Sequence, residues 1–107
     1  MAQSIRILYR GMQGRVPINF NWPPIHKNSA VIVTAAEYRL AGGIFGAEGR
    51  PLLGAAPVYV TNIGPHDPEG GDGGVEFMLH VEWDSPLDVI VTISVLEDVA
   101  TPSPVQG

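Results

Sequence analysis

Residues 75–95, VEFMLHVEWDSPLDVIVTISV, carry the clearest pattern in the chain. Apolar side chains occupy every second position of residues 75–83 and again of residues 87–95, on either side of Ser85-Pro86. Successive side chains of a β-strand point to opposite faces, so this alternation is typical of two strands that each bury one face. The pattern predicts a long β-hairpin that turns at Ser85-Pro86.

Keeping both apolar sets on one side of this hairpin determines its register, because a slip of one residue would turn one set outward. In that register Trp83 belongs to the core and Glu82 opposes Asp88 on the outer face. Like charges that oppose each other destabilise a sheet unless water, a basic group or a cation relieves them. His80, Glu82, Asp84 and Asp88 therefore form a candidate metal site, with Ca²⁺ suited to the carboxylates and a transition metal to the imidazole. The alternative is a solvated, charged outer face.

The rest of the chain is divided into short segments by 13 glycines and 10 prolines, which interrupt helices and favour turns. Residues 4–9, 16–22 and 58–63 are further strand candidates. Pro17 has no N–H to donate, which predicts that its strand lies at a sheet edge. Residues 30–40 mix helix-favouring and β-branched side chains, and the β-branched run favours a strand.

These segments predict an all-β protein, a single-domain antiparallel β-sandwich of about six to eight strands, either immunoglobulin-like or jelly-roll-like. Six strands are expected, or seven if the connection at residues 41–56 contributes one. We expect the domain to cover residues 1–100, with residues 101–107 as a flexible C-terminal tail. The chain contains no cysteine, so no disulfide supports the fold.

Charge is distributed unevenly along the chain. Residues 1–50 contain all six Lys and Arg residues and two acids, whereas residues 51–107 contain nine acids and no Lys or Arg. The acidic half would repel a polyanion, which argues against nucleic acid as a partner. No stretch is apolar and long enough to span a membrane, and the first residues lack the pattern of a cleaved signal. We expect a cytoplasmic protein, with signal-independent export as the alternative.

An acidic, glycine-rich segment at residues 64–74 is a second candidate site. Its three carboxylates among glycines resemble a calcium loop in composition, although their spacing does not match an EF-hand. Trp22 ends a strand candidate and is the aromatic side chain most suited to stack on a sugar. The candidate binding residues are Trp22, His66, Asp67, Glu69 and Asp72. Ca²⁺ is the only cofactor that this segment suggests, and the alternative is a plain hairpin loop.

The glycine-rich connection at residues 41–56 is a third candidate surface. It holds four large apolar side chains, which is unusual for a solvated loop, and long loops of this kind are often functional. It either covers an open end of its own core or forms a contact between copies of the chain. The candidate contact residues are Ile44, Phe45, Leu52 and Leu53.

The sequence contains no signature of catalysis. It has no Cys nucleophile, no G-x-S-x-G motif and no phosphate-binding loop. We therefore predict a non-catalytic binding or self-assembly module, whose partner is a further copy of itself or another protein. The alternative is a lectin-like carbohydrate-binding domain, with or without Ca²⁺. The third hypothesis is an acid–base enzyme that uses the hairpin carboxylates.

Overall fold

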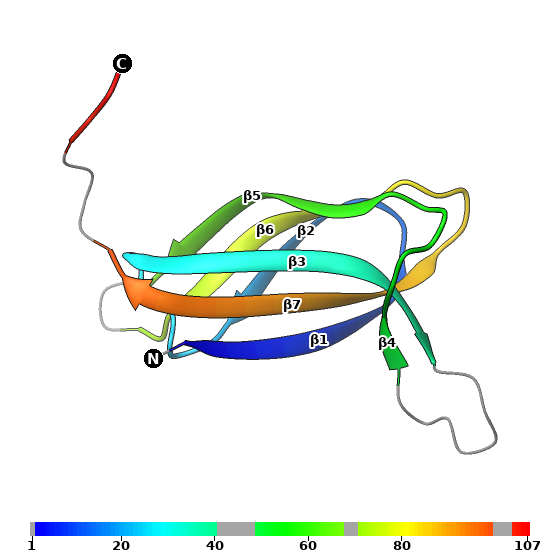
Figure 1. Cartoon of the computed structure of the whole chain (residues 1–107), viewed down its shortest axis with the longest axis horizontal. Coiled ribbons are helices and arrows are strands. Elements are labelled where there is room, and N and C mark those ends of the chain that lie inside the picture. Colours follow the sequence, from blue (N-terminus) through cyan, green and yellow to red (C-terminus); the bar gives the residue numbers. More distant parts are fainter. Residues whose placement is uncertain (1, 41–48, 68–70, 100–103) are drawn as a thin grey trace.

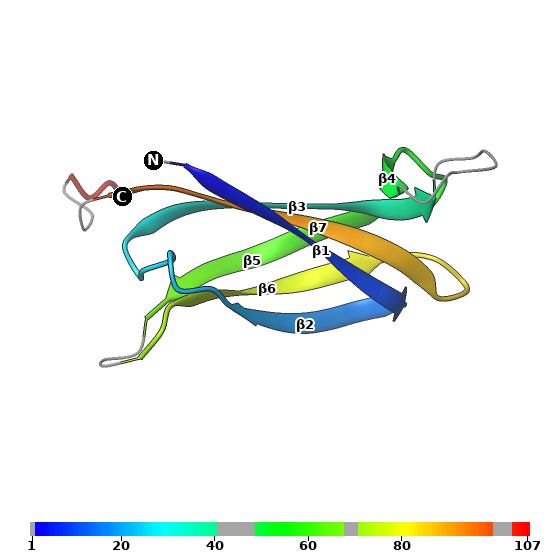
Figure 2. The same ribbon diagram turned by 90° about the horizontal axis from the view of Figure 1, so that it is seen from below.

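Two antiparallel β-sheets pack face to face in the computed structural model of the protein. The structure describes residues 2–40, 49–67, 71–99 and 104–107. The strands are β1 (Gln3–Met12), β2 (Gly14–Asn21), β3 (Ser29–Leu40), β4 (Gly49–Leu52), β5 (Val58–His66), β6 (Gly74–Val81) and β7 (Leu87–Asp98). Figure 2 shows the two layers, with β3 and β7 in one and β5, β6 and β2 in the other. The predicted β-sandwich is confirmed, and both residues 30–40 and the following connection contribute strands. None of the described residues forms a helix that is long and apolar enough to cross a membrane.

The order of strands is β1-β7-β3-β4 in the first sheet and β2-β6-β5 in the second (Figure 1). The first strand therefore pairs with the last, and the second strand with the last but one. This nested pairing is jelly-roll-like and differs from that of immunoglobulin constant domains, in which the first strand pairs with the second. β2 lies at a sheet edge, as Pro17 predicts.

The central strands β6 and β7 supply most of the core. Their inward side chains are almost completely buried: Val75, Phe77, Leu79, Val81, Val89, Val91, Ile93 and Val95. Ile25, in the connection from β2 to β3, is also fully buried against this set. The inward side chains of the edge strands β1 and β2, such as Ile7 and Ile18, are only half-buried. The core is therefore densest along β6 and β7.

The prediction that residues 75–83 and 87–95 form a β-hairpin is wrong. β6 and β7 belong to different sheets, and residues 82–86 cross from one layer to the other. The inner faces of both sheets pack on the same core. The apolar residues of β6 and β7 therefore alternate as predicted, although the two strands do not pair with each other. Trp83, predicted in the core, is 43% exposed. β6 ends at Val81, and the alternation of the strand no longer orients the side chains that follow.

β5 is longer than predicted and contains a bulge. The strand continues to His66, with a register shift between Thr61 and Gly64. Asn62 has a φ of 56°, in the left-handed region that asparagine adopts more readily than most residues. The extra residue changes which positions of β5 face outward. Thr61 faces outward before the bulge, and Gly64 and His66 face outward after it.

Candidate functional site

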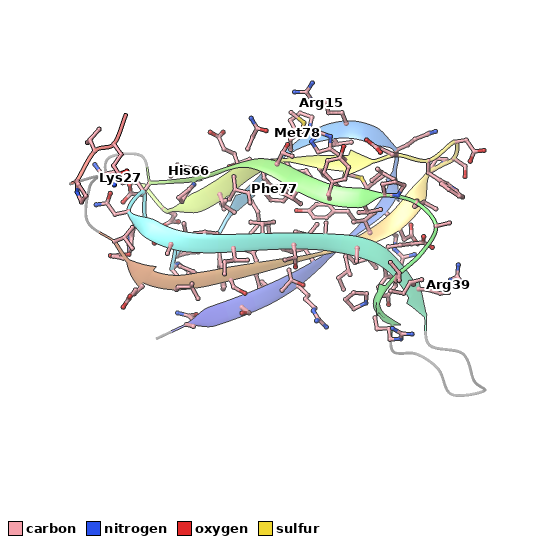
Figure 3. All side chains as sticks on the ribbon, turned by 45° about the horizontal axis from the view of Figure 1, so that its top comes forward. Arg15, Lys27, Arg39, His66, Phe77 and Met78 are labelled. Atoms are coloured by element: carbon pink, nitrogen blue, oxygen red, sulfur yellow. The ribbon has the colours of Figure 1, made fainter. Side chains whose placement is uncertain are left out.

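The outward side chains of β2, β6 and β5 form one mostly polar surface, here called the polar face. Its four cross-strand rows are Arg15–His80–Tyr59, Pro17–Met78–Thr61, Asn19–Glu76–Gly64 and Asn21–Gly74–His66. Six residues of strand separate the first row from the last, which is roughly 20 Å. Figure 3 shows Arg15 and Met78 close together on this face, with His66 and Lys27 toward its other end and Phe77 between the sheets.

Two hollows indent the polar face. The first has a volume of about 380 Å³ and is lined by Pro17, Ile18, Asn19, Asn62, Glu76, Phe77 and Met78. The second has a volume of about 580 Å³ and is lined by Asn19, Lys27, Pro65, His66, Asp67 and Glu76. Asn19 and Glu76 line both, so the two hollows adjoin at these side chains.

The amide of Asn19 is held in place by hydrogen bonds on both sides. Its nitrogen donates to the Asn21 side-chain oxygen at 3.1 Å, and its oxygen lies 2.6 Å from His66 Nε2. An amide oxygen can only accept, so His66 Nε2 carries the proton and donates it. Asn19 keeps one N–H and one oxygen lone pair beyond these two bonds. It is therefore an oriented donor and acceptor where the hollows meet.

Asp67 forms part of the wall of the second hollow. Its Oδ2 lies 3.6 Å from His26 Nδ1. Its Oδ1 is buried and has no hydrogen-bond partner among the described residues. The surrounding side chains therefore leave one oxygen of this carboxylate without a hydrogen bond, and burying an unpaired oxygen costs stability.

The other end of the polar face is occupied by side-chain contacts between β5 and β6. The ring of Tyr59 stacks on His80, with centroids 4.5 Å apart and planes 6° from parallel. The Tyr59 hydroxyl donates to Glu82 at 2.6 Å, and His80 Nε2 lies 2.7 Å from the Thr61 hydroxyl. The hydrogen bond to Glu82, together with desolvation and the nearby negative charge, raises the pKa of Tyr59. His80 and Glu82 thus contact β5 and not β7.

Removing the Glu82 carboxylate should lower the pKa of Tyr59 toward the ordinary tyrosine value of 10.0. Because the pKa of Tyr59 is higher in the folded than in the unfolded protein, the contact stabilises the folded state at neutral pH. This stabilisation is lost as the pH rises from the ordinary tyrosine pKa through the raised pKa of the folded protein. With Tyr9 and Tyr38 replaced by phenylalanine, Glu82→Gln should move the ultraviolet titration of Tyr59 to lower pH. The matched variant Glu97→Gln, on β7, should leave it in place. An unshifted titration in Glu82→Gln would contradict the contact.

The residues of the predicted metal site do not share a cross-strand pair. Their grouping depended on the hairpin register, which the sheet order excludes. Asp88, on β7, accepts a hydrogen bond from the Gly11 N–H at 3.1 Å, and Asp84 is exposed in the connection at residues 82–86. Within the described ranges, no three His, Asp or Glu side chains lie close enough together to hold a metal ion.

Of the predicted binding residues, His66 and Asp67 lie side by side in the second hollow. The Trp22 side chain is half-buried against the core, and the main-chain N–H of Trp22 donates to the Gly73 carbonyl at 2.8 Å. Asp72 is exposed and lines neither hollow. Glu69 lies outside the described residues.

Asn19 and Glu76, where the two hollows meet, are not among the site residues predicted from the sequence. The sequence does indicate that both side chains face outward, since each occupies a polar position in an alternating apolar–polar segment. Their meeting depends on the pairing of β2 with β6, which places Asn19 opposite Glu76. Nothing in either segment indicates that partner.

The end of β3 and β4 form a hairpin that projects from the sandwich in Figures 1 and 2. This hairpin, residues 37–40 with 49–53, is here called the arm. The Tyr38 ring lies over Gly49, where any side chain would collide with it. Leu52 is half-buried, whereas the next residue, Leu53, is 100% exposed. The other predicted contact residues, Ile44 and Phe45, lie outside the described residues.

The fold and these surfaces define a small two-sheet β-sandwich with a projecting arm and an indented polar face. No family model, no curated protein and no solved structure matches the chain.

Proposed function

We propose that the protein is a non-catalytic β-sandwich module that associates with further copies of itself through the arm. The observation that carries this proposal is the complete exposure of Leu53, which directly follows β4 at the base of the arm. Burying a leucine side chain is worth roughly 1.5–3 kcal/mol relative to leaving it in water. The same connection contains two further apolar residues, Ile44 and Phe45, in its sequence.

The charges at this end of the molecule support a contact between two copies. Arg39 and Arg50 oppose each other across the arm. The connection at residues 82–86, at the same end of the sandwich in Figure 1, carries Glu82 and Asp84. Arg39 also pairs with Glu37 within the arm at 3.5 Å, which leaves Arg50 as the uncompensated charge among the arm's described residues. A two-fold contact would bring Arg50 of each copy to the acidic connection of the other. Such charges mainly steer and orient the encounter, while apolar burial supplies most of the affinity.

Leu53→Gln should convert the oligomer to folded monomers, because it replaces an apolar contact by a polar side chain of similar size. The control is Val105→Gln: Val105 is 81% exposed, in the C-terminal segment, and its replacement should leave the assembly intact. Size-exclusion chromatography with light scattering measures both. Added salt should slow association and weaken it only modestly, since apolar burial is not screened. A wild-type protein that remains monomeric at high micromolar concentration and low salt would overturn the proposal.

A further inference from the structure

The polar face lies on the second sheet, whereas the arm extends the first. Its two hollows run along the sheet and adjoin at Asn19 and Glu76. Gly64, opposite Glu76, adds no side chain to this central row. The two hollows together follow the sheet from Met78 to His66, which suits an extended ligand better than a compact one.

The groups that line the two hollows can recognise hydroxyls. A hydroxyl both donates and accepts, so it pairs equally with amides, carboxylates and ammonium groups. Asn19 offers an N–H and an oxygen lone pair in an orientation that His66 and Asn21 already hold, which lowers the entropy lost on binding. Glu76 is exposed, and its carboxylate has no hydrogen-bond partner within the described part of the chain. Lys27 adds donors at the far end of the second hollow.

Apolar side chains accompany these polar groups. Met78 and Pro17 oppose each other in the next row and line the first hollow. Ligand sites commonly combine apolar walls with a few polar groups that orient the ligand, and the C–H faces of a sugar ring can pack on such walls. The stacked rings of Tyr59 and His80 continue the surface beyond Met78.

The polar face and its hollows carry charges of both signs, and the whole chain has a net charge of −5. Arg15 and Lys27 lie toward opposite ends of the face (Figure 3), and Lys27 lines the second hollow together with Glu76 and Asp67. A polyanion would approach Glu76, and a polycation would approach Lys27. Neither is favoured by a surface of mixed sign, whereas a neutral polar ligand is not repelled by either.

We propose that the polar face binds a neutral oligosaccharide, which lies along the sheet across the two hollows and hydrogen-bonds to Asn19 and Glu76. This site is independent of the arm, so it stands whether or not the protein associates with itself.

The test is an NMR titration of the ¹⁵N-labelled full chain with four neutral probes: cellohexaose, maltohexaose, mannohexaose and xylohexaose. At least one should shift the amide signals of Asn19, Glu76 and His66 and leave those of the central strand β7 unchanged. Glu76→Gln should weaken that binding about tenfold, because it removes hydrogen bonds to a charged acceptor. The matched variant Glu97→Gln, which is exposed on β7, should bind like the wild type.

Three outcomes would overturn the proposal. The first is the absence of any shift with all four probes at millimolar concentration. The second is binding that Glu76→Gln leaves unchanged, which would assign the sugar to another surface. The third is a response at the polar face only to a charged probe, either oligogalacturonate or hexalysine. Equal melting temperatures for Glu76→Gln and Glu97→Gln would show that a loss of binding does not come from unfolding.

Discussion

An aspartate at position 91 should unfold the protein. Val91 is 0% exposed and lies on β7, the strand at the centre of the first sheet. A carboxylate there would be buried without a partner, or would be forced to take up a proton. The expected loss exceeds about 4 kcal/mol, comparable to the whole stability of about 5–15 kcal/mol that a domain of this kind has. Val91→Asp should therefore lack a cooperative melting transition when followed by circular dichroism.

The control for Val91→Asp is the same change at the next residue. Thr92 points outward, and its hydroxyl accepts a hydrogen bond from Arg6 Nε at 3.2 Å. An aspartate at this position would meet the same guanidinium, so the melting temperature should change by only a few degrees. If Thr92→Asp were as damaging as Val91→Asp, the assignment of inner and outer faces along β7 would be wrong.

Gly73→Ala should cause the second-largest loss of stability. A Cβ at this position would overlap the main-chain carbonyl of Ile25, which belongs to the fully buried part of the core. Backbone cannot move aside as a side-chain rotamer can, so the connection from β2 to β3 would have to shift. That shift would also strain the hydrogen bond from the main-chain N–H of Trp22 to the Gly73 carbonyl. We expect a loss of about 3 kcal/mol, or a fall in melting temperature of roughly 10–20 °C.

Gly64→Ala is the matched control for this substitution. The nearest atom to a Cβ at Gly64 is Cγ of Glu76, at an ordinary contact distance of 3.6 Å. The variant should melt within a few degrees of the wild type in thermal denaturation. Equal losses for the two glycines would mean that the loop before β6 does not approach Ile25 closely in solution.

The faces of the strands could be predicted from the sequence, but their partners could not. The alternation in residues 75–81 and 87–95 identifies the inward side chains correctly, because burial selects apolar residues wherever a strand faces the core. A hairpin within one sheet and a connection between two sheets both turn these positions inward. The sequence pattern therefore could not distinguish them, and the register that paired Glu82 with Asp88 followed from the wrong alternative.

The sequence could single out some residues of the candidate surfaces by their type, but it could not show which residues lie beside them. His66 and Asp67 attracted attention by their residue types, and Leu53 by its apolar side chain in a glycine-rich connection. Asn19 and Glu76 are ordinary polar residues of edge and central strands, and only the register of β2 with β6 brings them together. The bulge at Asn62 was also missed, since a left-handed backbone conformation at a single asparagine leaves no periodic signal.

The place of β7 has a consequence for how the chain reaches its folded state. β7 is synthesised after the other six described strands, and it is the strand that lies between β1 and β3. Until it emerges from the ribosome, β1 has no partner strand and β3 pairs only with β4, so their free edges are open to aggregation. The second sheet does not wait for it, because β2, β5 and β6 all precede β7. We therefore expect slow folding dominated by distant contacts, in which the second sheet forms early and the first closes around β7 only after that strand has been synthesised.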